Sequence, residues 1–433
     1  MATSLAAGQR QEFARPTSRD DFQIAIVCAL PLEYDAISLL IDQVWDVKGD
    51  QHPFGRAPGD PNTYRNGRIS SFNVVLVLLP NMGKVGAAGA TASLRSSYPN
   101  LSLVLVVGIC GGMPFTKEEK EEEILLGDVI ISNILIQYDF GRQLSDRFLV
   151  KDSIEDSLGR PTQHIRSMLR LLEVESIRDG VEDDAAQYLQ MLQRKHDGHP
   201  KQRKLGKYKY PGAHKDKLFD CSYEHKHHGP SSSSSSSSDC SLCAAQGSST
   251  CERSMGLSCD DLHCDLSRLV HRERLAAQMQ ISDQPAFFPL RVFVGRMGSG
   301  DGVIRSAKHR QELAERGVIG VEMEGAGVWD QLPCIVIKGV CDYADSHKNK
   351  GWQDYAAATA VSVAKAVLEH CVTPMVTGRD PSSYGSGSGH HAVIHGTVSG
   401  SNVVMGGVHS TGGGTNNVRI GDNWGRAASW GEI

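Results

Sequence analysis

Three apolar runs of the chain each lead to a carboxylate. Residues 24–30 lead to Glu33, a later run leads to Glu324, and residues 335–340 lead to Asp342. In open α/β sheets the carboxyl ends of the strands meet at one edge, where ligands bind. A helix N-cap would explain any one of these acids, but buried acids are costly unless they are paired or functional. Three of them at one edge therefore indicate a site for acid–base chemistry.

A glycine-rich stretch follows another apolar run. Residues 106–112 read Val-Val-Gly-Ile-Cys-Gly-Gly, which predicts a strand ending in a turn where the backbone can approach a flat ligand closely. A plain turn is the alternative interpretation. The stretch differs from the Walker A and Gly-x-Gly-x-x-Gly patterns, and no Gly-Lys-Ser/Thr occurs. Hydrolysis at a γ-phosphate is therefore disfavoured.

The elements that must position these residues alternate between short β-branched runs and longer helical patterns. Runs that are apolar throughout are typical of strands buried on both faces of a sheet. The predicted strands are 24–28, 72–79, 101–107, 128–136, 290–294, 317–321 and 334–340, and the predicted helices are 33–41, 85–95 and 355–369. The fold class is therefore α/β, a three-layer sandwich with a central mixed, mainly parallel sheet, plus a flexible insertion and a Gly/Ser-rich tail.

Changes in composition divide the chain into segments. The predicted segments are a flexible N-terminus at 1–20, a catalytic domain at 21–175 and 285–373, a low-complexity insertion at 176–284 and a Gly/Ser/Asn-rich tail at 374–433. Eight consecutive serines in the insertion cannot bury enough apolar surface to offset their ordering entropy. The tail is either disordered or forms cross-β structure with copies of itself or with a partner, because its segments are short, low in charge and contain Asn.

Cysteine and histidine in the insertion raise the alternative of a metal site. Two residues separate Cys240 from Cys243, and Cys259 and Cys264 lie near His263 and the histidines at 225, 227 and 228. Their spacing is irregular for zinc and their setting is predicted to be disordered, so we expect loop thiols and no metal ligands. The remaining cysteines lie mainly in or beside apolar runs, which argues against a disulfide framework.

Composition limits the classes of function. The 433 residues carry a net charge of -5 with 22% charged residues, so no field gathers nucleic acid. No apolar run of about 18 residues predicts a membrane span, and the polar N-terminus lacks the apolar middle of a secretory signal. We therefore expect a cytoplasmic protein without a nucleic-acid or membrane partner.

Outside the insertion, residues 22–373 resemble the purine nucleoside phosphorylase and methylthioadenosine nucleosidase superfamily. Seven stretches in family order carry the resemblance: residues 26–33 (IVCALPLE), 83–88 (GKVGAA), 108–112 (GICGG), 126–132 (LGDVIIS), 298–301 (GSGD), 321–326 (VEMEGA) and 339–345 (GVCDYAD). Residues 137–142 and 345–352 are similar to a branch found in fungal immune-receptor-like proteins.

The resemblance implies a role for each acid. Glu33 matches the residue that positions and deprotonates the attacking water, and Asp342 matches the acid that protonates the departing purine at N7. Glu324, with Met323 beside it, matches the residue that grips the ribose hydroxyls. The residues that would line the base site are Cys110, Gly111, Gly112, Val303 and Ile304. These roles need no cofactor, because acid, base and ribose ligand are all side chains.

Departures from the family pattern refine the expectation. The branch that uses phosphate as nucleophile carries an arginine-containing loop after the first strand, whereas this chain has Pro31-Leu32-Glu33 there. Water is therefore the expected nucleophile. Gly302 and Val303 stand where an aromatic residue often stacks on the ligand, and Cys341 stands where a serine often precedes the catalytic acid.

Basic residues bear on the substrate. Six are expected near the mouth of the site: Lys84, Arg142, Arg305, Lys308, Lys338 and Lys348. Such donors suit a 5′-phosphate chain, whereas a methylthio group needs an apolar pocket; solvated surface charges are the alternative. The resemblance implies an ATP nucleosidase that releases adenine and leaves ribose 5′-triphosphate, acting as an immune or cell-death effector.

Two other functions remain open. One is a phosphate-dependent purine nucleoside phosphorylase. The other is a non-catalytic adaptor that assembles through its tail. The resemblance also implies a homo-oligomer that binds a purine nucleotide or nucleoside.

Overall fold

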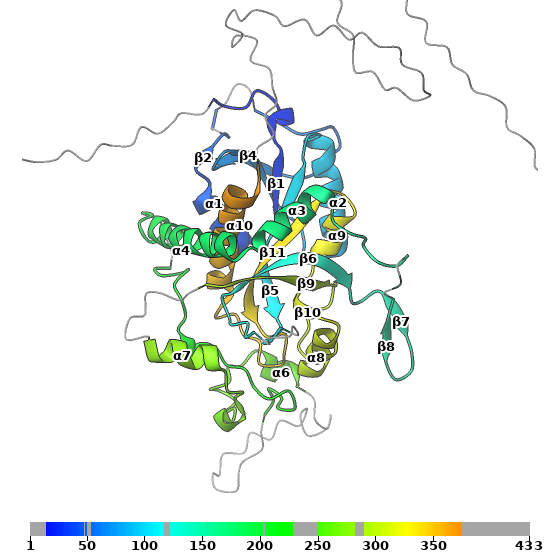
Figure 1. The fold of residues 1–433 in the computed structure, drawn as a ribbon, viewed down its shortest axis with the longest axis vertical. Helices are drawn as coiled ribbons and strands as arrows, with labels where there is room; N and C mark the ends of the chain where they lie inside the picture. Colours follow the sequence, from blue (N-terminus) through cyan, green and yellow to red (C-terminus); the bar gives the residue numbers. More distant parts are fainter. Residues whose placement is uncertain are drawn as a thin grey trace, which may run out of the picture. The chain divides into compact units, whose positions relative to one another are not determined.

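A computed structural model describes most of the chain between residues 14 and 373 (Figure 1). The described residues are 14–46, 48–49, 53–116, 122–151, 153, 155–201, 204–227, 250–281 and 290–373. The serine run, Cys240, Cys243 and the tail predicted at 374–433 lie outside them, as does most of the predicted N-terminal segment. The predictions made for those residues stay predictions.

The central element is a nine-stranded sheet. Its order is β10 (Val318–Glu322), β9 (Val292–Ser299), β6 (Val129–Gln137), β11 (Cys334–Asp342), β5 (Leu103–Gly112), β1 (Ile24–Cys28), β4 (Phe72–Leu78), β3 (Tyr64–Ile69) and β2 (Gln43–Val44). A separate hairpin, β7 (Gly141–Gln143) and β8 (Phe148–Val150), extends from the sheet (Figure 1). All seven predicted strands are present, several of them longer than predicted.

Strand β5 is one member of a closed ring of strands. It pairs in parallel with β1 and β11, and its last residues pair antiparallel with β10. Strand β11 pairs antiparallel with β6, and β6 and β10 each pair in parallel with β9. The path β5–β11–β6–β9–β10 therefore returns to β5, and this half of the sheet is a closed barrel.

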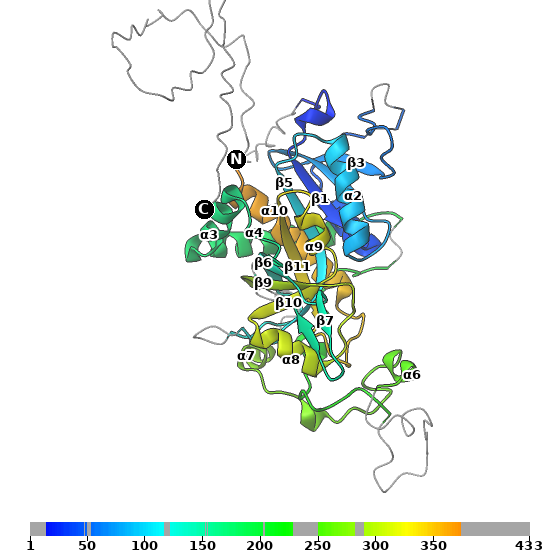
Figure 2. The same ribbon diagram turned by 90° about the vertical axis from the view of Figure 1, so that its right-hand side faces the viewer.

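Helices cover both faces of the sheet (Figures 1 and 2). Helix α10 (Gln353–Cys371) packs with α1 (Pro31–Leu40) and α4 (Glu175–Asp197) on one side, and α2 (Lys84–Ser97) packs with α9 (Gly325–Trp329) on the other. The remaining helices are α3 (Gln163–Leu172), α6 (Glu252–Met255), α7 (Glu273–Ile281), α8 (Ala307–Glu315) and the 3-10 turns Arg19–Asp21, Ala213–Lys215 and Leu266–Arg268. The prediction of an α/β three-layer fold is confirmed.

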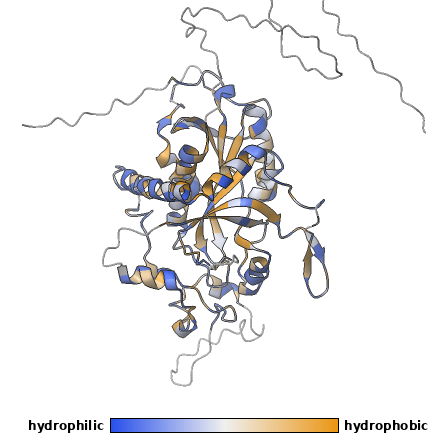
Figure 3. Ribbon diagram, viewed as in Figure 1, coloured by the Kyte–Doolittle hydropathy of each residue, from blue (hydrophilic) through white to orange (hydrophobic). Residues whose placement is uncertain are grey.

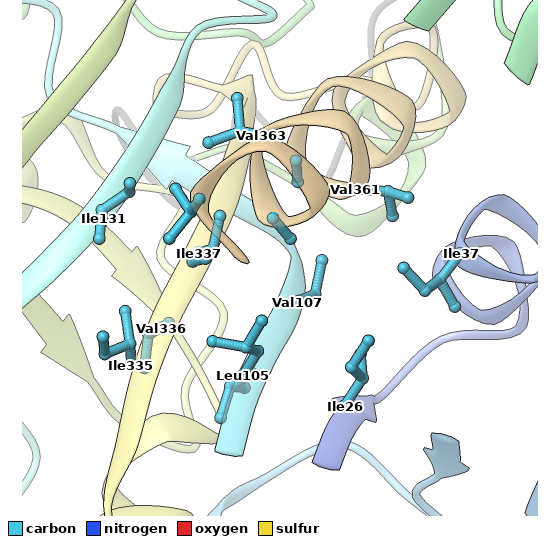
Figure 4. Packing of buried hydrophobic residues seen from close by; sticks show 14 of the residues in the cluster. Ile26, Ile37, Leu105, Val107, Ile131, Ile335, Val336, Ile337, Val361 and Val363 are labelled. Carbon is cyan, nitrogen blue, oxygen red and sulfur yellow. The ribbon is translucent and has the colours of Figure 1, made fainter. Parts of the chain in front are cut away.

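The core forms where α10 lies on the sheet. Val361 and Val363 of α10 face Val107 and Ile337 of the strands beneath (Figure 4). The central strands of the sheet are largely hydrophobic (Figure 3). Helix α10 and strand β11 approach each other closely, and glycine at position 339 of β11 allows this approach. A Cβ atom there would lie 2.0 Å from the carbonyl oxygen of Ala356 in α10. Packing against α10 therefore holds β11 in place, and β11 ends in Asp342.

The insertion predicted at 176–284 contains ordered structure within its described residues. Helix α4 runs from Glu175 to Asp197, and a buried stripe spaced at helical intervals contacts the domain: Val181, Ala185, Leu189 and Leu192. The description of this segment as flexible is therefore wrong for α4, because a stripe at this spacing buries one face of an otherwise polar helix. Among the described residues, no helix is long and apolar enough to cross a membrane.

Candidate active site

Glu33 lies in the first turn of α1, immediately after β1. Its side chain is buried, with 1% exposed. One carboxylate oxygen accepts hydrogen bonds from the backbone N–H groups of Ala29 and Leu30, each at 2.9 Å, and the other accepts from Ile109 N–H at 2.8 Å. Burial raises the pKa of Glu33, and the nearby charge of Lys338 and these hydrogen bonds oppose only part of that rise. The site therefore holds a fixed carboxylate with an increased affinity for a proton.

The glycine-rich residues 108–112 continue strand β5, so the predicted turn is wrong. Gly108 pairs with Lys338 and Gly111 pairs with Asp342 across the β5–β11 ladder. A side chain at Gly108 would lie 2.1 Å from a carboxylate oxygen of Glu33, and one at Gly111 would lie 3.1 Å from Asp342. The glycines are required because neighbouring side chains, including both predicted catalytic acids, fill the space that a Cβ atom would occupy.

A buried lysine compensates the acids at the end of β10. The Lys338 side chain, 1% exposed, lies with its ammonium 3.0 Å from Glu324 and 3.7 Å from Glu322. Burial alone would lower the pKa of Lys338, but the carboxylates of Glu324, Glu33 and Glu322 raise it overall. Burial also raises the pKa of Glu322, against the opposing charge of Lys338. Three acids thus share one cation.

Glu324 also contacts the start of helix α2. The carboxylate oxygen that does not contact Lys338 accepts a hydrogen bond from the backbone N–H of Gly83, with an N···O distance of 3.4 Å. Glu322 has a different role, because it accepts hydrogen bonds from the backbone N–H groups of Glu324 and Gly325. Glu322 therefore shapes the turn that presents Glu324.

Asp342 has its own cation at the end of β11. Its carboxylate lies 2.9 Å from the ammonium of Lys348 and accepts a hydrogen bond from the Cys341 thiol at 3.2 Å. The other oxygen accepts from Ala344 N–H at 2.9 Å. Ala344 has a φ of 52°, a left-handed backbone that is uncommon for a residue with a side chain and is found at functional sites. The turn after β11 therefore holds the acid in a fixed direction.

Strand β5 brings the two predicted catalytic acids to one edge. Glu33 bonds to Ile109 N–H, and Asp342 lies opposite Gly111. Two residues along a strand correspond to about 7 Å. Glu324 joins them through Lys338, which faces Gly108 in the ladder. The three carboxylates predicted from separate strand ends thus converge around β5.

The other residues predicted to line the base site differ in how deeply they are buried. Cys110 is buried and its carbonyl oxygen lies 3.3 Å from the Cys341 sulfur, and Gly112 packs on Val340. Ile304 is buried, whereas Val303 is 53% exposed and Met323 is half-buried. These contacts leave the base-binding role of each residue as a prediction.

The six predicted phosphate ligands divide into two groups. Lys84, Lys338 and Lys348 contact Asp139, Glu324 and Asp342 respectively. The other three are Arg142 and Lys308, which are exposed, and Arg305, which is half-buried. The positive charge of Arg305 acts to lower the pKa of Lys348, although Asp342 and Cys341 raise it overall against the effect of burial. Arg305 thus lies near the Asp342 end of the site.

The sequence did not predict the positions of two residues in the cluster of acids. Glu322 was not assigned a role, and Lys338 was assigned to phosphate binding, whereas the structure surrounds it with carboxylates. A signal was present, because a lysine inside a fully apolar strand is rarely buried unless it is paired.

The described residues also line a cavity away from these acids. It has a volume of about 1070 Å³ and lies between α4 and β9, with Glu175, Asp179, Arg178 and Arg296 in its lining. Glu33, Glu324 and Asp342 are not among the residues that line it. The cavity is therefore separate from the candidate active site.

Part of the chain is similar to a known protein family. Residues 23–161 match the family model of the phosphorylase superfamily. The chain is 29% identical over 357 residues to a nucleotide-binding leucine-rich repeat (NLR)-like protein of Hyaloscypha variabilis. That match covers 81% of this chain and 29% of the relative, so the chain spans less than a third of the relative's length.

Two solved structures are among those to which the chain is similar. The futalosine hydrolase of Helicobacter pylori is 16% identical, with 81% of this chain and 98% of that chain covered at a TM-score of 0.41. The 5′-methylthioadenosine/S-adenosylhomocysteine nucleosidase of Neisseria meningitidis is 16% identical, with 80% and 98% covered at a TM-score of 0.39. The match over residues 23–161 includes the first four of the seven sequence motifs, and this part of the chain is similar to the phosphorylase superfamily.

Proposed function

We propose that the protein hydrolyses the N-glycosidic bond of a purine nucleotide or nucleoside, with ATP as the preferred substrate and adenine and ribose 5′-triphosphate as products. The observation that carries this proposal is the convergence of Glu33, Glu324 and Asp342 around the end of β5. Each carboxylate has a different set of partners there. Different partners allow the three groups to hold different protonation states, as acid, base and hydroxyl ligand require.

Glu33 is the proposed general base. Its oxygens are held by three backbone N–H groups, and burial raises its pKa toward the range in which a carboxylate accepts a proton from water effectively. A water beside Glu33 would attack C1′ of the ribose as its proton passes to the carboxylate. The fixed orientation lowers the entropic cost of that attack.

Asp342 is the proposed acid for the leaving base. Negative charge accumulates on the purine as the glycosidic bond breaks, and a proton delivered to N7 removes it. The ammonium of Lys348, 2.9 Å from Asp342, provides positive charge at the same end of the site. The turn through Ala344 holds the carboxylate toward the Gly111 position of β5.

Glu324 is the proposed ligand of the ribose hydroxyls. One of its oxygens bonds to Lys338, and the other faces the Gly83 N–H at the start of α2. Lys84 follows directly and its ammonium contacts Asp139. A basic side chain beside the ribose ligand favours a 5′-phosphorylated substrate, because phosphate oxygens accept hydrogen bonds from ammonium groups. This position supports ATP over a methylthio nucleoside.

We further propose that the activity serves an immune or cell-death response through loss of a nucleotide pool. The 29% identity to an NLR-like protein supports this role. We also propose that the protein forms a homo-oligomer and that its tail binds a partner through cross-β pairing.

The test is product analysis in phosphate-free buffer. The full chain is incubated with ATP, AMP, adenosine and methylthioadenosine, and free adenine is separated by chromatography. We expect adenine from ATP, its loss in Asp342→Asn, and unchanged release in Asp146→Asn, whose side chain is 68% exposed on the hairpin. Release that needs added phosphate would establish a phosphorylase, and equal release by Asp342→Asn would remove that residue from the mechanism.

A further inference from the structure

A second cluster of reactive side chains lies in residues 216–227 and 250–281, outside the candidate active site. Its members are His225, Cys259 and Cys264, whose potential ligand atoms all lie within 4.8 Å of one another. The Nδ1 atom of His225 is 3.5 Å from the sulfur of Cys264 and 3.8 Å from the sulfur of Cys259. His225 and Cys264 are buried, and Cys259 is half-buried.

These distances match the edges of a metal coordination tetrahedron. With a Zn–S bond of about 2.3 Å and a Zn–N bond of about 2.0–2.1 Å, the S···N edge is about 3.6 Å. Thiol–imidazole hydrogen bonds do not explain the arrangement as well. Nδ1 of a neutral imidazole offers one lone pair, so it can accept from one thiol, whereas two sulfurs converge on it.

The other nitrogen of His225 supports the same interpretation. Nε2 lies 3.0 Å from the carbonyl oxygen of Leu257, which can only accept, so Nε2 carries the proton. The lone pair of Nδ1 is therefore directed toward the two sulfurs. A second nitrogen that donates to a backbone carbonyl is the usual support of a metal-bound histidine.

We propose that His225, Cys259 and Cys264 bind a structural Zn²⁺ ion. One nitrogen and two sulfur ligands favour zinc over Mg²⁺ or Ca²⁺, which prefer oxygen ligands. These three residues would supply three of the four ligands of a tetrahedral zinc ion. The local apolar cluster consists of only Phe219, Leu262 and Cys264 with Tyr223 and Cys259 against it, so a metal would supply the cohesion that this small core lacks. This proposal replaces the expectation of loop thiols.

The site would also support the candidate active site. The backbone N–H of His225 donates a hydrogen bond to the hydroxyl of Ser346 at 2.9 Å, and the His347 ring stacks on Phe219 with ring centroids 4.0 Å apart. The next residue, Lys348, contacts Asp342. Zinc would therefore hold the segment that carries the lysine partner of the catalytic acid. This coupling rests on the proposed function, whereas metal binding does not.

The first experiment measures zinc in the full chain. Protein expressed with added zinc is passed through metal-free, reducing buffer, and its zinc content is determined by elemental analysis. We expect about one zinc per chain in the wild type and in Cys221→Ser, a control with an exposed thiol in the same segment. The Cys259→Ser/Cys264→Ser double variant should lose at least nine-tenths of it.

A second measurement uses only the wild-type chain, so it tests the proposal even if the double variant does not fold. Zinc in the wild-type chain is replaced by Co²⁺, and a thiolate-to-cobalt charge-transfer band with tetrahedral d–d absorption is expected. A wild-type chain that retains no zinc and gives no such band, a folded double variant with full zinc, or a Cys259–Cys264 disulfide would overturn the proposal.

The coupling is tested separately from metal binding. Removal of zinc with a chelator should lower adenine release at least tenfold, and added Zn²⁺ should restore it. Unchanged release after full zinc loss would overturn the coupling. Failure of the wild-type chain to cleave any nucleotide would instead overturn the proposed function, because the zinc content would still be measured.

Discussion

Replacement of Lys338 by methionine tests whether one cation stabilises the whole acid cluster. Methionine has a similar length but no charge, so Lys338→Met leaves Glu322 and Glu324 without their ion pair and Glu33 without a nearby positive charge. Removal of one partner of a buried pair costs about 3–5 kcal/mol. At roughly 2–4 °C per kcal/mol, the melting temperature should fall by roughly 6–20 °C.

The loss should depend on pH in a defined direction. Burial already raises the pKa of Glu33 and of Glu322, and Lys338 acts against both shifts. Without Lys338 these pKa values rise further in the folded state, while the unfolded value stays at about 4.3. Between the unfolded and folded pKa values the folded chain binds more protons, so stability falls as pH rises. The deficit of Lys338→Met should therefore be larger at pH 8 than at pH 5.5.

The assay is thermal unfolding of wild type and variants across this pH range. Lys365→Met is the matched control, because Lys365 is also buried and also paired. The side chain of its partner Asp42 is 38% exposed, so water can solvate the remaining carboxylate and a smaller loss is expected. Equal losses in the two variants, or a Lys338→Met deficit that does not change with pH, would refute the shared-cation interpretation.

Three further changes test single contacts. Glu33→Gln should lower kcat by about 10²–10⁴-fold and remove the acidic limb of the pH–rate profile, because a base with a raised pKa must lose its proton first; an unchanged acidic limb would contradict this. Gly108→Ala would place Cβ 2.1 Å from Glu33 and should abolish turnover, whereas Gly89→Ala, with no atom within 4 Å, should retain it. Lys84→Gln should raise KM for ATP about tenfold, the equivalent of about 1.4 kcal/mol, and change KM for adenosine less than twofold; equal changes would exclude Lys84 from phosphate binding.

The strands could be predicted from the sequence because their patterns are unambiguous. Runs such as residues 24–28 and 334–340 are apolar throughout, and the structure buries every residue of β1 and β11. Helix α4 was missed because most of its residues are polar and its buried stripe is sparse. The closure of the barrel was also not predicted, because β5 and β10 are about 200 residues apart in sequence and periodicity reports only local structure.

The convergence of the three acids was predictable from topology, whereas their electrostatic partners were not. Parallel strands place their carboxyl ends together, so Glu33 and Asp342 were expected at one edge. The sequence does not show which cation faces which acid, because that depends on register. The register pairs Lys338 with Gly108, directly beneath Glu33, and thereby places the lysine among the acids.

The unequal distribution of the two lysines agrees with the different tasks proposed for the acids. Asp342 contacts the ammonium of Lys348 directly, whereas Glu33 is held by backbone N–H groups and shares Lys338 with two other carboxylates. A carboxylate with only a shared cation keeps a higher proton affinity, which suits a base that must take a proton from water. A lysine held beside the other acid supplies positive charge where the leaving base becomes negative. In the proposed mechanism, the placement of the lysines therefore matters as much as the placement of the acids.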